Sequence, residues 1–142
     1  MARRSDILAS LTASLQSGTY VGTSLGTSQA QRGFRYIDQI NDFPYISYSA
    51  SSSALTHIGD DVRYSRMEIQ LRGYVRGENA QDLSDQLALD IEDVLQSFRE
   101  SASALDVVDC RILSVSTDEG LMEPYGIVDI AFECSYQHDE GV

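Results

Sequence analysis

The fold of this chain is decided by residues 67–76, which read MEIQLRGYVR, and by residues 79–98, which read NAQDLSDQLALDIEDVLQSF. In the first segment, every second residue from Met67 to Val75 is apolar or glycine. This alternation predicts a β-strand with one buried face and one wet or interfacial face. In the second segment, apolar residues recur at every third or fourth position. That spacing predicts an amphipathic helix of roughly five turns, capped by Asn79.

A shorter helix is predicted near the N-terminus, because Ile7, Leu11 and Leu15 recur every four residues and form one apolar face. Ser5 is expected to cap this helix at its start. Gly18 is expected to end it as the C′ residue.

Further strands are predicted on both sides of the central pair. Residues 43–48 form an edge strand that begins at a proline, and residues 34–37 form a weaker strand. Residues 107–115 and 127–136 form the last two strands. In the final strand, one phase is apolar and the other is mostly polar, at Asp129, Glu133 and Ser135.

The order of these elements predicts one domain over residues 1–142, a length usual for a single domain. The fold class is α+β, with a mostly antiparallel sheet and both helices packed on one face. Two stretches rich in glycine, serine and threonine, residues 22–33 and 49–62, are predicted to be long flexible loops.

The charge of the chain is strongly acidic, with a formal net charge of -12, and all ten basic residues are arginines. Such a surface repels free nucleic acid and anionic lipid, because phosphate binding needs clustered positive charge. We therefore expect neither specific DNA binding nor a membrane role. No apolar run is long enough to cross a bilayer. Arginine without lysine suits fixed, bidentate ion pairs at protein interfaces.

No pattern in the sequence predicts an active site, a metal site or a cofactor. His57 and His138 lack a ligand or catalytic partner at suitable spacing. Asp90 and Asp93 would share a helix face, and paired carboxylates can bind a divalent cation. A solvated acidic face is the simpler interpretation, since the calcium-loop pattern is missing. The chain has no GxSxG motif and no phosphate-binding loop. It is therefore predicted not to be an enzyme.

The two cysteines, Cys110 and Cys134, fall inside predicted strands and match no zinc or CxxC spacing. They are interpreted as small buried residues in a reduced, intracellular protein. A disulfide between them requires that their strands lie side by side, which the sequence leaves open.

Three segments taken together resemble a known family. They are the strand at residues 67–76, the helix that opens with NAQDL at residues 79–83, and the segment TDEGLMEPYG at residues 117–126 before the final strand. This arrangement resembles the tail terminator, or tail completion, proteins of tailed bacteriophages. The resemblance covers roughly residues 4–136.

The resemblance implies a structural virion protein that forms a homohexameric ring at the head-proximal end of the tail. Such a ring caps the tail tube, ends its polymerisation and joins the tail to the head connector protein. It also contacts the sheath in contractile tails. Assembly would take place in the host cytoplasm, and DNA would pass through the lumen without specific binding.

A cyclic ring needs two different complementary patches on each subunit. We predict that the arginine-bearing strand face of one subunit meets the acidic helix face of the next. The candidate interface residues are Arg66, Arg72, Arg76, Asp82, Asp85, Glu92 and Asp93.

Other functions remain open at this point. One alternative is a head–tail connector subunit or another minor tail ring protein, which would bind the portal complex in place of the tube. A more remote alternative is a small enzyme. Another is a ligand-binding module that uses the tyrosine-rich sheet face, and a metabolite that raises the melting temperature would support it.

Overall fold

The computed structural model describes residues 4–20, 23–24, 30–33, 39–40, 43–57, 62–101, 107–119 and 124–139. Within them lie the helices α1 (Arg4–Ser17) and α2 (Ala80–Ser101) and a five-stranded sheet with the order β3-β4-β5-β7-β6. The strands of the sheet are β3 (Ala30–Arg32), β4 (Tyr45–His57), β5 (Val62–Arg76), β6 (Val107–Thr117) and β7 (Tyr125–Asp139). A small second sheet pairs β1 (Thr19–Tyr20) with β2 (Thr23–Ser24).

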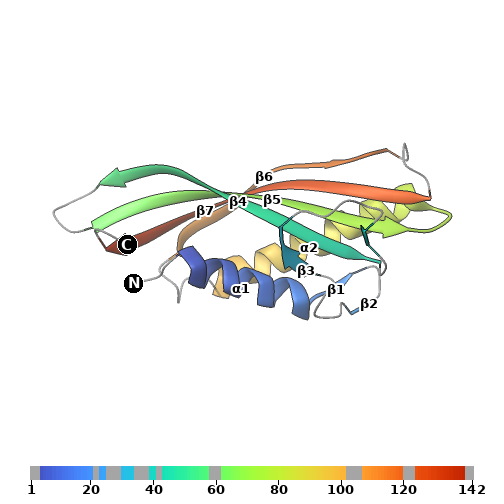
Figure 1. Ribbon diagram of the computed structural model, residues 1–142, viewed down its shortest axis with the longest axis horizontal. Coiled ribbons are helices and arrows are strands. Elements are labelled where there is room, and N and C mark those ends of the chain that lie inside the picture. Colours follow the sequence, from blue (N-terminus) through green and yellow to red (C-terminus); the bar gives the residue numbers. More distant parts are fainter. Residues whose placement is uncertain are drawn as a thin grey trace.

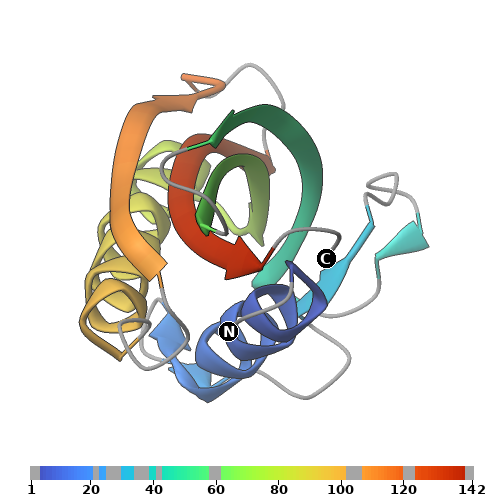
Figure 2. The ribbon, with the colours of Figure 1, turned by 90° about the vertical axis from the view of Figure 1, so that its left-hand side faces the viewer.

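The α+β class and the mostly antiparallel sheet are confirmed. Strand β5 lies at the centre and pairs antiparallel with both β4 and β7, and β6 pairs antiparallel with β7. The one parallel pair joins β3 to the start of β4. Both helices lie along the same side of the twisted sheet, as the side view and the end-on view show (Figures 1 and 2).

The core forms between α2 and the apolar phase of β5 and β7. On β5, Met67, Ile69 and Leu71 are at most 1 % exposed. They belong to the same buried cluster as the apolar stripe of α2, at Leu87, Ile91, Leu95 and Phe98. Each such side chain gains roughly 1.5–3 kcal/mol on burial. Because Gly73 has no side chain, α2 can approach β5 closely: a Cβ atom there would lie 2.8 Å from Cδ2 of Leu87.

Helix α1 buries its predicted apolar face at Ile7, Leu11 and Leu15. The helix begins at Arg4, so Ser5 lies in its first turn and does not occupy the predicted cap position. Two tyrosine hydroxyl groups donate hydrogen bonds to backbone carbonyl oxygens of the helix. Tyr48 on β4 donates to Leu8 at 3.1 Å, and Tyr20 on β1 donates to Leu15 at 2.8 Å.

Gly18 follows the helix as predicted, but its backbone does not adopt the left-handed conformation of a C′ residue. The small size of Gly18 matters in another way, since the hydroxyl oxygen of Tyr20 and a methyl group of Val94 occupy the space a Cβ atom would need.

The two predicted loops are partly strand. Strand β4 continues to His57, where residues 49–62 were expected to form a loop, and both β2 and β3 fall inside residues 22–33. The serine- and alanine-rich run of β4 has no hydrophobic period, and its extended form comes from pairing with the long strand β5. The edge position predicted for residues 43–48 is also wrong, because β3 covers β4 from Ile46 to Tyr48. The strand predicted at residues 34–37 lies outside the described residues.

The alternation along β5 predicts that Tyr74 lies on the wet or interfacial face of the strand, but the structure buries it. Its side chain is 3 % exposed and belongs to a second, smaller cluster with Ile40 and Tyr45. The rings of Tyr45 and Tyr74 lie on directly paired residues, with centroids 6.5 Å apart. This end of the sheet therefore has apolar packing on both faces.

Candidate functional site

The predicted interface arginines of β5 lie on the sheet face that points away from α2. The Nε atom of Arg66 lies 2.7 Å from a carboxylate oxygen of Glu133, and that of Arg72 lies 2.7 Å from Oδ1 of Asp129. Arg76 stacks over the ring of Tyr125, with its guanidinium carbon 5.5 Å from the ring centroid. The structure thus gives all three arginines partners within the chain, and their contact with a neighbouring subunit stays a prediction.

Glu133 is the charged residue that sequence reasoning missed. Its phase on β7 predicted an outward, solvated side chain, yet it is 4 % exposed. Arg66 and Arg111 each donate to one of its two carboxylate oxygens, Arg111 at 3.0 Å from the neighbouring strand β6. Glu68 is paired directly with Glu133 across the ladder, so the two arginines also offset repulsion between like charges. This Arg66–Glu133–Arg111 cluster joins β5, β7 and β6.

The pair of Arg72 and Asp129 is more open to solvent. Both side chains are about two-fifths exposed, at 42 % and 44 %. The hydrogen bond to Asp129 raises the pKa of Arg72 above its ordinary value, so the guanidinium stays charged. These two residues also line a shallow depression on the sheet face, together with Gln70, Ser114, Ser116 and Ala131. Pairs this exposed contribute at most about 1 kcal/mol to folding.

The predicted acidic residues lie on α2, on the other side of the sheet. Asp82, Asp85 and Asp93 are exposed, and Glu92 is partly exposed. The structure therefore does not bring the arginines and the acidic helix residues together within one subunit. It places them on opposite sides of the sheet, and their contact across two copies of the chain stays a prediction.

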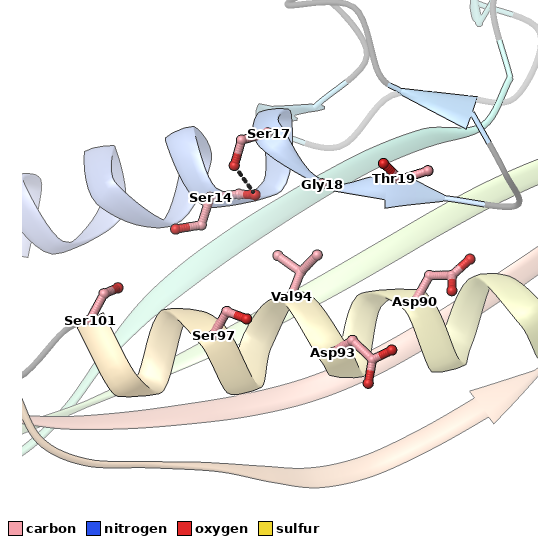
Figure 3. Close-up of a pocket in the computed structure, with 9 residues that line it drawn as sticks. All are labelled: Ser14, Ser17, Gly18, Thr19, Asp90, Asp93, Val94, Ser97 and Ser101. Carbon is pink, nitrogen blue, oxygen red and sulfur yellow. Dashed lines mark hydrogen bonds between the residues drawn. The ribbon is translucent and has the colours of Figure 1, made fainter.

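A polar groove of about 460 Å³ separates the end of α1 from α2 (Figure 3). Its lining carries serine and threonine hydroxyl groups and two carboxylates, from Ser14, Ser17, Thr19, Asp90, Asp93, Ser97 and Ser101. Asp90 accepts a hydrogen bond from the side chain of Gln86 at 2.9 Å. Among the described residues, no group of three or more histidine, cysteine, aspartate or glutamate side chains is placed to hold a metal ion.

The two cysteines are direct partners across the ladder between β6 and β7. Their Sγ atoms lie 3.2 Å apart, and both are buried free thiols. The hydrogen bond to Cys110, together with burial, raises the pKa of the Cys134 thiol. The strands therefore do adjoin, which answers the question that the sequence left open.

Comparison with known proteins identifies the family of the chain. A family model for bacteriophage tail tube terminator proteins matches residues 2–142. This chain belongs to the bacteriophage tail tube terminator family. The tail tube terminator protein p142 of Escherichia phage T5 is 25 % identical over 111 residues, a match that covers 70 % of this chain and 69 % of that protein.

Membership of the terminator family makes the chain a structural component of the virion tail that associates with tube components. This confirms the family predicted from the strand at residues 67–76, the helix after it and the segment at residues 117–126. Within the described part of the chain, no helix is long and apolar enough to span a membrane.

Proposed function

We propose that this terminator forms a homohexameric ring that caps the finished tail tube, stops tube polymerisation and joins the tail to the head connector protein. The observation that carries this proposal is the match to the terminator family along almost the whole chain. The ring occupies the head-proximal end of the tail and is assembled in the host cytoplasm. In a contractile tail it also contacts the last ring of the sheath.

The charge distribution supports a ring. The arginine-bearing sheet face and the acidic face of α2 lie on opposite sides of each subunit, so the same two surfaces can meet at every contact around a closed ring. We propose Arg66, Arg72 and Arg76 on one side and Asp82, Asp85, Glu92 and Asp93 on the other as contact residues. Because Arg66 and Arg72 already have partners in the chain, a neighbour's carboxylate would join an existing ion pair.

The net charge of -12 supports the passage of DNA. A duplex that moves through the lumen must not adhere to its wall, and acidic residues repel phosphate. We therefore propose transit without specific binding. No step of this function requires a cofactor, a metal ion or catalysis.

Tube polymerisation in vitro tests the capping role. Purified tail tube protein is polymerised with and without this protein at one terminator per several tube subunits, and tube lengths are measured by negative-stain electron microscopy. A terminator shortens or arrests tubes and leaves a ring of density at one end. Unchanged lengths with no density at either end would contradict the proposal. Binding to the portal complex instead of the tube would favour a connector subunit.

A further inference from the structure

The thiol groups of Cys110 and Cys134 are placed where a disulfide bond can form between two strands. The two residues are directly opposed in the antiparallel ladder between β6 and β7, and their Sγ atoms lie 3.2 Å apart. Both are free thiols that are at most 1 % exposed. Because a disulfide bond measures about 2.05 Å, its formation brings the two sulfur atoms only about 1 Å closer together.

Strand β6 can make this small adjustment. Among the strands in the described part of the chain, it pairs with β7 alone. The ladder has register irregularities on both sides of Cys110, one between Val107 and Asp109 and the other between Ile112 and Ser114. Pairing is locally disrupted at such irregularities. The segment that carries Cys110 is therefore less constrained than the strands at the centre of the sheet.

A small molecule can reach one of the two thiols. A cavity of about 130 Å³ lies between α2 and β6, and its lining among the described residues includes Cys110 but not Cys134. Arg99 and Arg111 also line the cavity, and their side chains are 53 % and 64 % exposed, so the cavity opens to the surface. A water molecule needs about 10–15 Å³ of such space. Hydrogen peroxide, which is only slightly larger than water, therefore fits beside Cys110.

The surroundings of the pair also distinguish the two thiols. The hydrogen bond with Cys134 lowers the pKa of Cys110, and the positive charge of Arg99 acts in the same direction, whereas burial and Asp109 oppose this change. The same hydrogen bond raises the pKa of Cys134. The thiolate is the form of cysteine that attacks an oxidant. Cys110 is therefore suited to attack an oxidant in the cavity, and Cys134 to react in a second step.

We propose that Cys110 and Cys134 form a modification site, at which a hydroperoxide oxidises the two thiols to a disulfide bond between β6 and β7. The Cys110 thiolate attacks one oxygen of the peroxide and the O–O bond breaks. The departing hydroxide takes up the proton that Cys110 released and becomes water, and Cys110 now carries a sulfenic acid. The sulfur of Cys134 attacks the sulfenic sulfur, the S–O bond breaks, and a second water leaves with the Cys134 proton. The thiols lose two electrons, and the peroxide gains them.

The disulfide would stabilise the tail component after the virion leaves the host. Thiols stay reduced in the cytosol, whereas disulfides persist on virions outside the cell. The bond would join an edge strand covalently to its neighbour and close a loop of 25 residues, from 110 to 134. Such a loop restricts the unfolded chain and so favours the folded one. The inference concerns a single subunit and holds whether or not the ring forms.

Peroxide oxidation of the full-length protein tests the site without any substitution. The reduced protein is freed of reductant and treated with hydrogen peroxide, and the remaining thiols are alkylated. Trypsin cleaves after Arg99 and Arg111, so the two cysteines fall in the separate peptides 100–111 and 112–142. We expect the intact chain to lose two hydrogen atoms, and the two peptides to appear linked in the absence of reductant.

The melting temperature gives a second readout in the same protein. Oxidation should raise it by roughly 5–10 °C, and dithiothreitol should return it to its starting value. Single substitutions then test the two roles. In Cys134→Ala, Cys110 should form a sulfenic acid that dimedone traps. In Cys110→Ala, Cys134 should react with peroxide at least about tenfold more slowly than Cys110 does in Cys134→Ala.

Several results would overturn the proposal. The thiols could stay free in the folded chain under conditions that oxidise the urea-unfolded chain, or they could form disulfides only between chains. Sulfinic acid could accumulate with no linked peptide. A rise in melting temperature that dithiothreitol does not reverse would also contradict a disulfide. If Cys134 alone reacts as fast as Cys110 alone, then the cavity does not select Cys110 as the attacking residue.

Discussion

Replacing Glu133 by glutamine should lower the free energy of unfolding by about 2–3 kcal/mol. The carboxylate is 4 % exposed and accepts hydrogen bonds from Arg66 and Arg111 at 2.7 and 3.0 Å. Breaking a buried ion pair costs about 3–5 kcal/mol. The two arginines are 48 % and 64 % exposed, so water compensates part of that loss. The glutamine amide can accept from one arginine, but its NH₂ group would face the other.

Urea denaturation followed by circular dichroism measures this change, because small domains unfold cooperatively. The matched control is Asp129→Asn, which neutralises one carboxylate on the same strand. Its partner Arg72 is about two-fifths exposed, so the expected loss is at most about 1 kcal/mol. If Glu133→Gln lowers the free energy of unfolding no more than Asp129→Asn does, then the burial of Glu133 does not make the Arg66–Glu133–Arg111 cluster more stabilising than the exposed pair.

Three further predictions concern the core and its hydroxyl groups. Gly73→Ala should destabilise the fold by about 1–3 kcal/mol in urea, because the new Cβ atom would lie 2.8 Å from the buried side chain of Leu87; an unchanged midpoint would show that α2 does not pack this closely. Tyr48→Phe should cost about 0.5–1.5 kcal/mol by removing the hydrogen bond to the Leu8 carbonyl, and a neutral effect on the melting temperature would contradict that bond's role. Burial raises the pKa of Tyr20 above its ordinary value of 10.0. The stabilisation from burying Tyr20 is therefore fully present below about pH 10, where its hydroxyl group is neutral in both the folded and the unfolded chain. It declines as the pH rises above 10, because Tyr20 then ionises in the unfolded chain before it ionises in the folded chain. Tyr20→Phe should flatten the fall in stability between pH 10 and 11, and an unchanged slope would refute this.

The central part of the fold could be predicted because its hydrophobic periods are strong. The alternation along β5 and the stripe on α2 specify their buried faces without reference to the rest of the chain. The same reasoning predicted the apolar phase of β7, where Val128, Ile130, Phe132 and Cys134 are buried. A local hydrophobic pattern is enough to predict a helix or strand when one of its faces is buried and the other stays in water.

Strand β4 could not be predicted beyond Tyr48 for the opposite reason. Serine and alanine carry no period, and the extended backbone there depends on hydrogen bonds to a strand whose position the sequence does not reveal. The pairing of β3 with β4 is likewise set by contacts distant in sequence. Long-range pairing of this kind overrides local propensity.

Surface residues were harder to predict than the core, because their environment depends on the order of strands in the sheet. Glu133 is outward by phase but is covered by two arginines from adjacent strands. Ile112 and Val115 look like core residues by type, yet they are exposed because β6 lies at the edge. The predicted interface arginines were placed on the correct strand, but their partners within the chain follow from the register of β5 with β7.

The solution mass of the purified protein tests the ring most directly. Light scattering at low and at moderate salt should give a discrete species of about six times the chain mass of 15.7 kDa. Moderate salt should weaken it in part, because screening reduces the attraction between the charged faces of neighbouring subunits. A single-chain mass at every concentration and salt, both free and when recovered from tube ends, would contradict a terminator that acts as a ring.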